Sequence, residues 1–269
     1  MAQTHLLIGA GKMGGALLKG WLESGLVSRR NLCILDPNPG TEAVYAIEKG
    51  AKHLHAPQDI PKSVRTVLLG IKPQIFEQLG PELGESLPEK AIIVSILAGT
   101  SLRTLRKHLG ERTIIRVMPN TPAAIGAGIS AMFADPTVSE EHLDLTEALL
   151  TAGSKVVRVE SESALNAVTA VSGSGPAYVF HLVETLEAAA RDLGLPKEIA
   201  AELARETIIG SAKLLEDSSE TPGTLRKNVT SPNGTTQAAL DELMSENGLS
   251  RLMLQAVRAA FARAKELAG

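Results

Sequence analysis

The order of apolar and polar positions divides the chain into two parts. Up to about residue 160, short runs of aliphatic and β-branched residues alternate with longer segments in which apolar residues recur at helical spacing. Runs of the first kind predict buried strands, and segments of the second kind predict amphipathic helices. This alternation predicts an α/β domain with a doubly wound, mostly parallel sheet. The expected strands are 5–8, 31–35, 66–69, 91–95, 113–117 and 155–159, and the expected helices are 12–24, 41–49, 74–83, 101–109 and 140–151.

The pattern changes after residue 161, where the β-branched runs stop and the chain becomes rich in alanine. Two apolar stripes follow at helical spacing, one from Val179 to Leu193 and one from Leu249 to Phe261. We therefore expect two domains, an α/β domain at 1–160 and an all-α domain at 161–269. Each stripe needs a covering partner, either within one compact bundle or across an interlocked dimer. The length of the stripes favours the dimer.

Composition narrows the class of protein further. Hydrophobic residues make up 44% and charged residues 21% of the 269 positions, which is the composition of an ordinary globular chain. Aromatic residues are only 3%, and 27 lysine and arginine residues stand against 30 aspartate and glutamate residues, for a formal net charge of −3. A chain so poor in stacking platforms and basic charge is not expected to bind nucleic acid.

Cys33 is the only cysteine, so one chain can form neither an internal disulfide nor a cysteine-based zinc site. This fits a reducing compartment, and because the N-terminus lacks a basic region and a long apolar run, we expect a cytoplasmic protein. Uncharged stretches at 117–134 and 163–180 are interrupted by glycine, proline and polar residues, so no membrane span is expected. Only His53 and His55, in a probable strand, have metal-like spacing, and we expect no metal.

A glycine-rich segment follows the first expected strand directly. It reads Gly9-Ala10-Gly11-Lys12-Met13-Gly14. This G-x-G-x-x-G spacing permits a tight turn, a close approach of the backbone to a pyrophosphate and close packing of the next helix, whose first amides bind the phosphates. Glycine clusters also form ordinary turns, but the place between the first strand and the first helix favours a dinucleotide site. The Gly-Lys-Ser/Thr ending of phosphate-loop NTPases is missing.

Two further positions lie where expected parallel strands end. Asp36 follows the second strand, where a carboxylate can bond the ribose hydroxyls of NAD and repel a 2′-phosphate. It is also a good first residue for the turn at 36–40. Lys72, followed by Pro73, lies at the edge where open α/β sheets bind ligands, or is a solvated lysine before a structural proline. The sequence leaves both alternatives open.

Three segments without charged residues are rich in hydroxyl groups and glycine, namely 118–122, 172–178 and 231–236. Exposed amides and hydroxyls in such loops can bind a small polar ligand, although each segment also fits a plain turn before a helix. A helix that starts near Thr235 would direct free amides at a small carboxylate.

These loops, the order of the two domains and the string at 222–240 closely resemble the pyrroline-5-carboxylate reductases. The string reads PGTLRKNVTSPNGTTQAAL, and the resemblance spans nearly the whole chain. It implies a Rossmann domain followed by an all-α dimerisation domain, and a homodimer or a ring of dimers. It also implies an NAD(P)H-dependent oxidoreductase that reduces the C=N bond of 1-pyrroline-5-carboxylate to L-proline, the last step of proline biosynthesis.

The resemblance assigns roles motif by motif. The glycines of the turn would hold the pyrophosphate, while residues 71–73 and 97–98 would line the nicotinamide half. The implied cofactor-binding set is Gly9, Gly11, Lys12, Met13, Gly14, Asp36, Ile71, Lys72, Pro73, Leu97, Ala98 and Asn228. The implied substrate-binding set is Ser231, Gly234, Thr235 and Thr236, and the hydroxyl of Thr236 would act near the ring nitrogen as the catalytic group.

The chain departs from the family pattern at two positions. Relatives usually have glycine where this chain has Asn233, and because asparagine tolerates positive φ, we expect the turn to survive. Relatives often carry serine or threonine, in contact with the 2′-phosphate, at the position of Asp36. Since a carboxylate there would repel that phosphate, we expect NADH to be used at least as well as NADPH.

Two other functions compete with this one. A β-hydroxyacid dehydrogenase also joins a Rossmann domain to helices and shares Gly173-Ser174-Gly175, but it needs a lysine where this chain has Val179. A non-catalytic NAD(P)-sensing protein would keep the segment 9–14 and has no need of a carboxylate-binding loop at 231–236.

Overall fold

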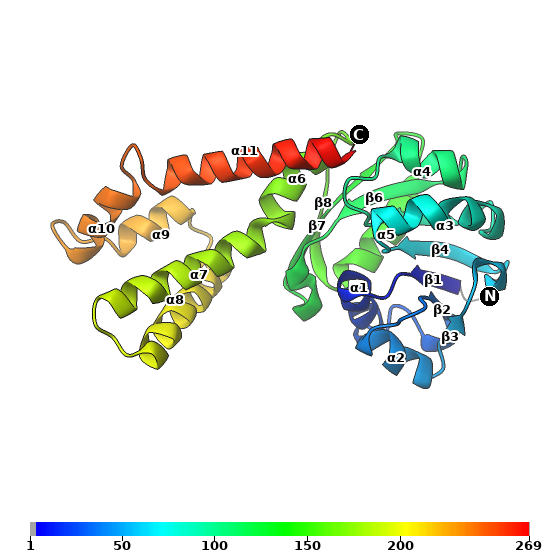
Figure 1. Ribbon diagram of the computed structural model, residues 1–269, viewed down its shortest axis with the longest axis horizontal. Coiled ribbons are helices and arrows are strands. Elements are labelled where there is room, and N and C mark those ends of the chain that lie inside the picture. Colours follow the sequence, from blue (N-terminus) through cyan, green and yellow to red (C-terminus); the bar gives the residue numbers. More distant parts are fainter. Residues whose placement is uncertain (1–3, 269) are drawn as a thin grey trace. The chain divides into compact units, whose positions relative to one another are not determined.

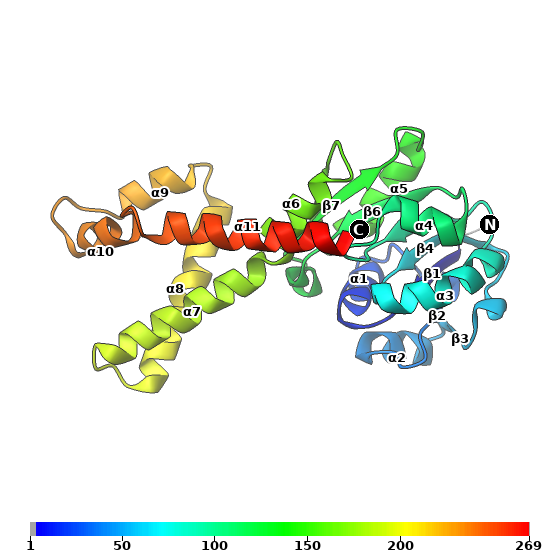
Figure 2. The same cartoon turned by 45° about the horizontal axis from the view of Figure 1, so that its top comes forward.

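The computed structural model describes residues 4–268, which form two units (Figures 1 and 2). One unit runs from the start of the described chain to Ser174 and includes the C-terminal segment from Ala260 onwards. The other unit is Gly175–Ala259.

An eight-stranded sheet forms the centre of the first unit. Its strand order is β3-β2-β1-β4-β5-β6-β7-β8, and every neighbouring pair is parallel except β6 and β7. The predicted doubly wound, mostly parallel sheet is therefore confirmed. The strands are β1 Thr4–Ile8, β2 Leu32–Leu35, β3 Lys52–Leu54, β4 Val64–Leu69, β5 Ile92–Ser95, β6 Ile114–Met118, β7 Gly128–Ala134 and β8 Ser154–Arg158.

Helices cover both faces of this sheet because its central strands bury both of their faces. Leu6 and Ile8 of β1 lie in a core with α3 and α4, whereas Leu7 between them lies in a core with α1, α2 and α5. Successive side chains of a strand point to opposite faces, so one apolar run supplies two cores. The α-helices of this layer are α1 Lys12–Glu23, α2 Thr41–Glu48, α3 Pro73–Ser86, α4 Leu102–Leu109 and α5 Glu140–Thr151. Short 3-10 turns are η1 Arg29–Asn31, η2 Pro57–Asp59 and η3 Thr121–Ile125.

The strand register brings three loops to one edge of the sheet. Ile8 pairs with Leu35 of β2 and with Leu69 of β4. The residues that follow these three, which begin with Gly9, Asp36 and Gly70, therefore emerge side by side at the carboxyl edge. Open α/β sheets bind their ligands at this edge.

The structure adds two strands to the six expected ones. β7 lies within a stretch whose glycine, serine and alanine residues gave no strand signal, and it joins the sheet antiparallel to β6. β3 contains His53 but ends before His55. Helix α3 is longer than expected and continues to Ser86, because Gly80 and Gly84 allow it to lie directly against His108 of α4.

The segment 172–178 is helical and is not a loop. α6 Ala164–Val168 continues into the π-helical segment η4 Thr169–Gly173, and α7 Gly175–Asp192 follows at once. A π-helical turn inside a helix is uncommon and often marks a functional site.

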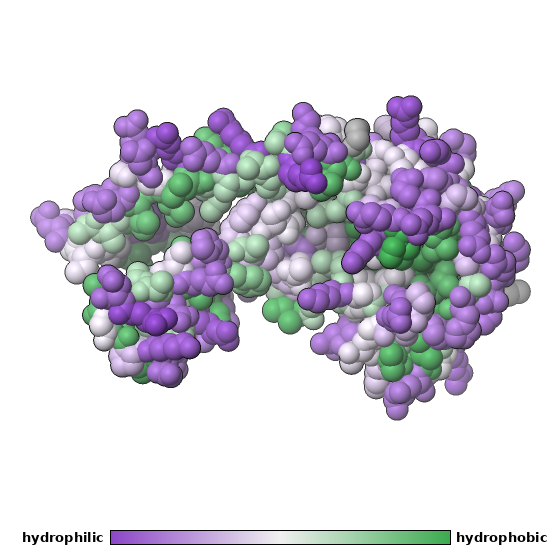
Figure 3. Space-filling view, viewed as in Figure 1, coloured by the Kyte–Doolittle hydropathy of each residue, from purple (hydrophilic) through white to green (hydrophobic). Residues whose placement is uncertain are grey.

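The second unit consists of helices with almost no interior. Its helices are α7, α8 Lys197–Asp217, α9 Pro222–Asn228, α10 Thr235–Leu243 and the first part of α11 Leu249–Ala268. Within Gly175–Ala259, Ala200 and Ala204 are the only buried residues. Large apolar side chains remain exposed, including Phe180 at 64% and Leu252 at 59%. Figure 3 shows such hydrophobic residues along these helices.

Candidate functional site

Each glycine of the turn between β1 and α1 has its own physical reason. Gly9 has a φ of +90°, and a Cβ there would lie 2.7 Å from the backbone of Gly70, so the turn requires glycine. A Cβ at Gly14 would lie within van der Waals overlap of the carbonyl oxygen of Gly9, so α1 packs directly on the turn. A Cβ at Gly11 would meet nothing within 4 Å. Gly11 therefore leaves an open space at the start of α1.

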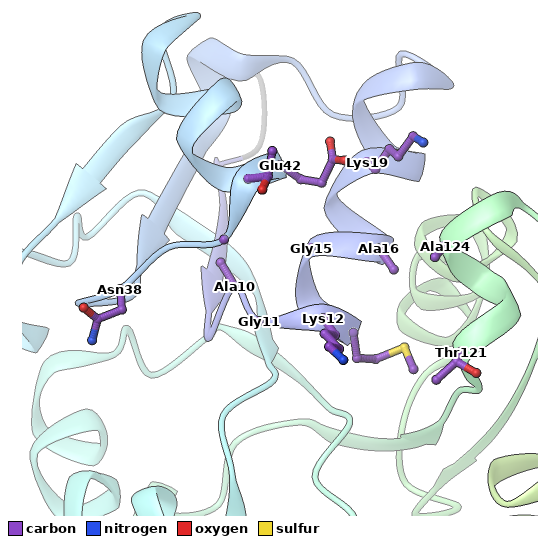
Figure 4. Close-up of a pocket in the computed structure, with 13 residues that line it drawn as sticks. Ala10, Gly11, Lys12, Gly15, Ala16, Lys19, Asn38, Glu42, Thr121 and Ala124 are labelled. Carbon is purple, nitrogen blue, oxygen red and sulfur yellow. The ribbon is translucent and has the colours of Figure 1, made fainter. Parts of the chain in front are cut away.

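Two cavities lie beside this turn, with volumes of about 720 Å³ and 550 Å³. Gly11 and Asn38 line both of them. Figure 4 shows the larger cavity between the start of α1, the β2–α2 turn and η3. Its lining includes Lys12, Met13 and Thr121. The smaller cavity is lined on one side by Asp36 and on another by Ile71 and Lys72, among other residues.

Asp36 joins the β2–α2 turn to the glycine turn. Its Oδ2 accepts a hydrogen bond of 2.6 Å from the amide of Ala10, and its Oδ1 accepts one of 2.8 Å from the amide of Asn38. The carboxylate thus starts the turn, as one of the two alternatives predicted, and it also lines the smaller cavity. Its contact with a ribose stays a prediction. Its backbone carbonyl lies 3.0 Å from Nε2 of His53.

The residues expected around the nicotinamide differ in burial and in whether they line a cavity. Ile71 is partly buried against the core, and Lys72 is the N-cap of α3, with Pro73 as the first helical residue. Pro73 is absent from the lining of both cavities. After β5, Leu97 is buried in the core at 3% exposure, so only its backbone can face a ligand. Ala98 next to it is exposed.

A hydrogen bond from β7 to a buried side chain holds the uncharged segment after β6 in place. The buried Asn120 accepts a hydrogen bond of 2.9 Å from the amide of Ile129 through Oδ1. This bond ties the segment to β7 and leaves Thr121 and Ala124 of η3 to line the larger cavity. β7, the strand that the sequence did not predict, thus supports one wall of the site.

The expected carboxylate loop lies in the second unit and ends in a helix start. Asn233 has a φ of +59°. The prediction that asparagine adopts the positive φ of the glycine usual at this position, so that the turn survives, is confirmed. Gly234 donates its amide to the carbonyl of Ser231 at 3.1 Å and is the N-cap of α10, which begins at Thr235. No side chain caps this helix start. The first-turn amides, with the half-buried Thr236, are therefore open to an anionic group.

Asn228 ends α9 in the same unit. Its Nδ2 donates a hydrogen bond of 2.9 Å to Oε2 of Glu220. The side chain is exposed, so this bond can exchange for a ligand.

Several cavity-lining side chains lie outside the predicted set of site residues, among them Thr121, Asn38 and His55. Thr121 carried a weak signal as part of an uncharged loop, and Asn38 was predicted to hold a phosphate only in the alternative in which Asp36 points away as a turn residue. His55 lines the smaller cavity, and its ring lies 4.5 Å from that of His53. Over residues 4–268 no cluster of three histidine, cysteine or acidic side chains could hold a metal ion, and no helix there is long and apolar enough to cross a membrane.

A helix that starts on a bare glycine beside cavities at the carboxyl edge of a parallel sheet is how dinucleotide-dependent oxidoreductases hold their cofactor, and this chain is of that class. The profile described as NADP oxidoreductase, coenzyme F420-dependent, matches residues 6–99, and that described as pyrroline-5-carboxylate reductase dimerisation matches residues 162–267. The pyrroline-5-carboxylate reductase of Arabidopsis thaliana is 36% identical over 97% of this chain and 94% of its own length. The chain belongs to the pyrroline-5-carboxylate reductase family.

Solved structures agree with this assignment. A pyrroline-5-carboxylate reductase from Coxiella burnetii is 33% identical, with a TM-score of 0.91 and full coverage of both chains. The Plasmodium falciparum pyrroline carboxylate reductase with NADP bound is 25% identical, with a TM-score of 0.85, and the match covers 99% of this chain and 98% of that one.

Proposed function

We propose that the protein reduces the C=N bond of 1-pyrroline-5-carboxylate to give L-proline, with NADH or NADPH as the reductant. The observation that carries this proposal is the glycine turn, where Gly9 and Gly14 are forced by close backbone contacts and Gly11 leaves space for a pyrophosphate. This turn occurs in a chain that is similar to pyrroline-5-carboxylate reductases over 97% of its length.

The residues of the first unit would hold the cofactor. The amides of Lys12 and Met13 at the start of α1 face the pyrophosphate, and Asp36 accepts hydroxyl groups of the adenosine ribose. Ile71, Lys72 and the backbone at 97–98 would border the nicotinamide half, and the resemblance to the family also gives the exposed amide of Asn228 a role in cofactor binding. When bound, the reduced nicotinamide supplies the hydride that reduces the imine carbon.

The start of α10 would bind the substrate carboxylate. Ser231 and Thr235 supply hydroxyls there, and the uncapped amides add the positive end of the helix dipole. An iminium is already a good hydride acceptor, so the protein contributes mainly alignment and charge complementarity, which together can supply ~7–11 kcal/mol. This explains why the loop at 231–236 carries no charged residue.

Thr236 would hold or donate the proton at the ring nitrogen. Thr236 lies in the first turn of α10 and is half-buried, so it belongs to the same helix start whose amides would bind the carboxylate. An alcohol is a weak acid, and water is the final source of the proton in this scheme.

The protein would act as a homodimer, alone or within a ring of dimers. The α-helical unit exposes Leu252 and Phe180, and an apolar groove of about 420 Å³ runs between α7 and α11. A second copy supplies the same apolar surface, as the family profile over 162–267 suggests. In this scheme residues 1–160 bind the cofactor and residues 161–269 bind substrate and dimerise. The single buried thiol, Cys33, fits a cytoplasmic location.

The test is a coupled measurement of turnover and product. Purified protein is mixed with NADH or NADPH, with and without 1-pyrroline-5-carboxylate, and both cofactor absorbance and L-proline are followed. We expect cofactor oxidation and proline only when the imine is present. Cofactor binding without turnover would support the sensing protein instead, and oxidation of a β-hydroxyacid with NAD(P)⁺ would support the dehydrogenase.

A further inference from the structure

The loop between β5 and α4 gives Ala98 and Gly99 no support of its own. Leu97 and Thr100 on either side are buried, whereas Ala98 is exposed and Gly99 has no side chain. Among residues 4–268, neither Ala98 nor Gly99 forms a hydrogen bond. A backbone segment that is held neither by burial nor by hydrogen bonds is free to move unless another segment packs against it.

The last turn of α11 packs against this segment. α11 ends at Ala268 (Figures 1 and 2), and its residues from Ala260 onwards belong to the α/β unit. A Cβ placed on Gly99 would lie 2.8 Å from the carbonyl oxygen of Leu267 and 3.0 Å from the Cβ of Leu267. The φ of Gly99 is +69°, which also requires glycine. The two main chains therefore meet with no side chain between them.

Burial of an apolar side chain does not explain this contact. Leu267 is 55% exposed, and it lies against Gly99 through its carbonyl group and its Cβ. Ala264, three residues earlier on the same face of the helix, is buried. The last turn of α11 is thus anchored in the α/β unit through Ala264, and Leu267 is left to support the loop.

The supported loop leaves the sheet at the edge where the glycine turn lies. Ser95, the last residue of β5, pairs with Leu69, which in turn pairs with Ile8. The Cδ1 atom of Ile96 lies 3.3 Å from the position of a Cβ on Gly70. The loop is therefore next to the segment that begins at Gly70, and both segments are proposed to border the nicotinamide half of the cofactor.

We propose that the last turn of α11 is a positioning element of the cofactor site. The main chain of Leu267 supports Gly99 and thereby sets the place of the Ala98 backbone beside the nicotinamide. The inference rests on the proposed role of residues 97–98 and goes beyond it. It gives α11 two roles, since the first half of this helix lines the apolar groove of the proposed dimer and its end supports the cofactor loop.

The experiment separates the two halves of the cofactor. Calorimetric Kd values are measured for NAD⁺ and for ADP-ribose, which lacks the nicotinamide, and for the 2′-phosphorylated form of each. One variant is a chain that ends at Glu266, and the other is Gly99→Ala, whose Cβ would push the two main chains apart. We expect both variants to weaken the dinucleotide about tenfold, equivalent to ~1.4 kcal/mol, and to leave the Kd for ADP-ribose unchanged.

Two control variants test for effects of strain and of the helix end alone. Gly110→Ala imposes similar strain, because Gly110 has a φ of +71°, but a Cβ there would lie no closer than 3.7 Å to its nearest neighbour, Arg112. Glu266→Ala removes an exposed ion pair with Arg263 from the last turn of α11 and keeps Leu267. Both controls should keep the wild-type ratio of the two Kd values.

Three results would overturn the proposal. An unchanged Kd for the dinucleotide in the chain that ends at Glu266 would free the loop from α11, and a loss in Gly99→Ala alone would assign the effect to the loop itself. An equal loss for both probes would give α11 only a role in the stability of the unit. Because the assay contains no imine, it gives an answer even if the proposed reduction of 1-pyrroline-5-carboxylate fails. Where the imine is reduced, kcat should fall as well, since a misplacement of about 1 Å can lower a rate by about 10²-fold.

Discussion

The carboxylate of Asp36 lies 2.6 Å from the backbone nitrogen of Ala10, in the middle of the glycine turn. The same side chain therefore determines both the shape of the turn and the charge next to the expected ribose. A substitution at this position is therefore expected to change cofactor choice and stability together, and the two effects need separate measurements.

Asp36→Ser should shift the ratio of kcat/KM towards NADPH, because the substitution removes a negative charge beside the expected 2′-phosphate. The wild type should use NADH at least as well as NADPH. Loss of the two amide hydrogen bonds should also lower the free energy of unfolding by about 1.5–3 kcal/mol, measured by denaturant titration.

Asp36→Asn is the matched control, because it removes the charge and keeps an oxygen that can accept one amide bond. A strong preference of the wild type for NADPH, or an unchanged ratio of kcat/KM values in Asp36→Ser, would show that Asp36 only forms the turn and does not determine the choice of cofactor.

Thr236→Ala should lower kcat by about 10²-fold while the Kd for NADPH stays the same, since the hydroxyl is proposed to act at the imine nitrogen. Thr236→Ser, which keeps the hydroxyl, should recover most of the activity. Thr230→Ala is the control for a purely structural effect of removing a hydroxyl from this region. The hydroxyl of Thr230 donates a hydrogen bond of 2.6 Å to the carbonyl of Arg226 and has no proposed role in catalysis. If Thr236→Ala turns over normally, the hydroxyl merely supports the start of α10.

Leu252→Glu should convert the proposed dimer to a monomer with a partly unfolded helical unit, because it places a charge in the apolar surface at a side chain that is 59% exposed in one chain. Light scattering gives the mass, and circular dichroism gives the helix content. Gln255→Glu, on the same helix and also exposed, adds the same charge and should remain a dimer. A stable, active wild-type monomer would contradict the assembly proposed here.

Glu162→Ala should destabilise the first unit by about 3–5 kcal/mol, because Arg116 is 7% exposed and would lose its only carboxylate partner among the described residues. Oε1 of Glu162 accepts from Arg116 at 2.8 Å and from the amide of Leu102 at 2.6 Å. Thermal unfolding of the double variant Arg116→Met/Glu162→Ala should recover much of the loss. If the double variant is as unstable as Glu162→Ala, the loss of stability comes from the hydrogen bond between Glu162 and the amide of Leu102.

Stability should fall as the pH drops below about 6.5, in part because of His5. Burial lowers the pKa of His5, so the unfolded chain takes up a proton at a higher pH than the folded one does. The contribution of His5 is complete above the unfolded pKa and is lost as the pH falls towards the folded pKa. His5→Phe should flatten this part of the curve of unfolding free energy against pH. A curve identical to that of the wild type would assign the acid sensitivity to other groups.

The strands that the sequence predicted are those whose apolar residues form continuous runs. Leu6, Leu7 and Ile8 fill both cores, and such a run has one stable environment, the middle of a parallel sheet. β7 escaped prediction because Gly128, Ser130 and Ala131 have no strand preference of their own, and pairing with β6 and β8 gives them that structure.

The site was predictable where the backbone demands a residue type. Gly9, Gly14 and Asn233 each correspond to a conformation or contact that the sequence pattern expresses directly. That the β1–α1 turn and the β2–α2 turn share the lining of one cavity was not predictable in this way, because it depends on the hydrogen bonds that tie these two turns together.

Only Ala200 and Ala204 are buried in the helical unit Gly175–Ala259, so in the proposed dimer the folding of this unit would depend on protein concentration. A segment that obtains its hydrophobic core from a second copy has no fixed melting temperature of its own. Its unfolding midpoint should rise with protein concentration, whereas the α/β unit, with a core on each face of its sheet, should unfold at a midpoint that dilution does not move. Dilution is therefore expected to unfold the loop at 231–236, proposed to bind substrate, before it affects the glycine turn proposed to bind the cofactor.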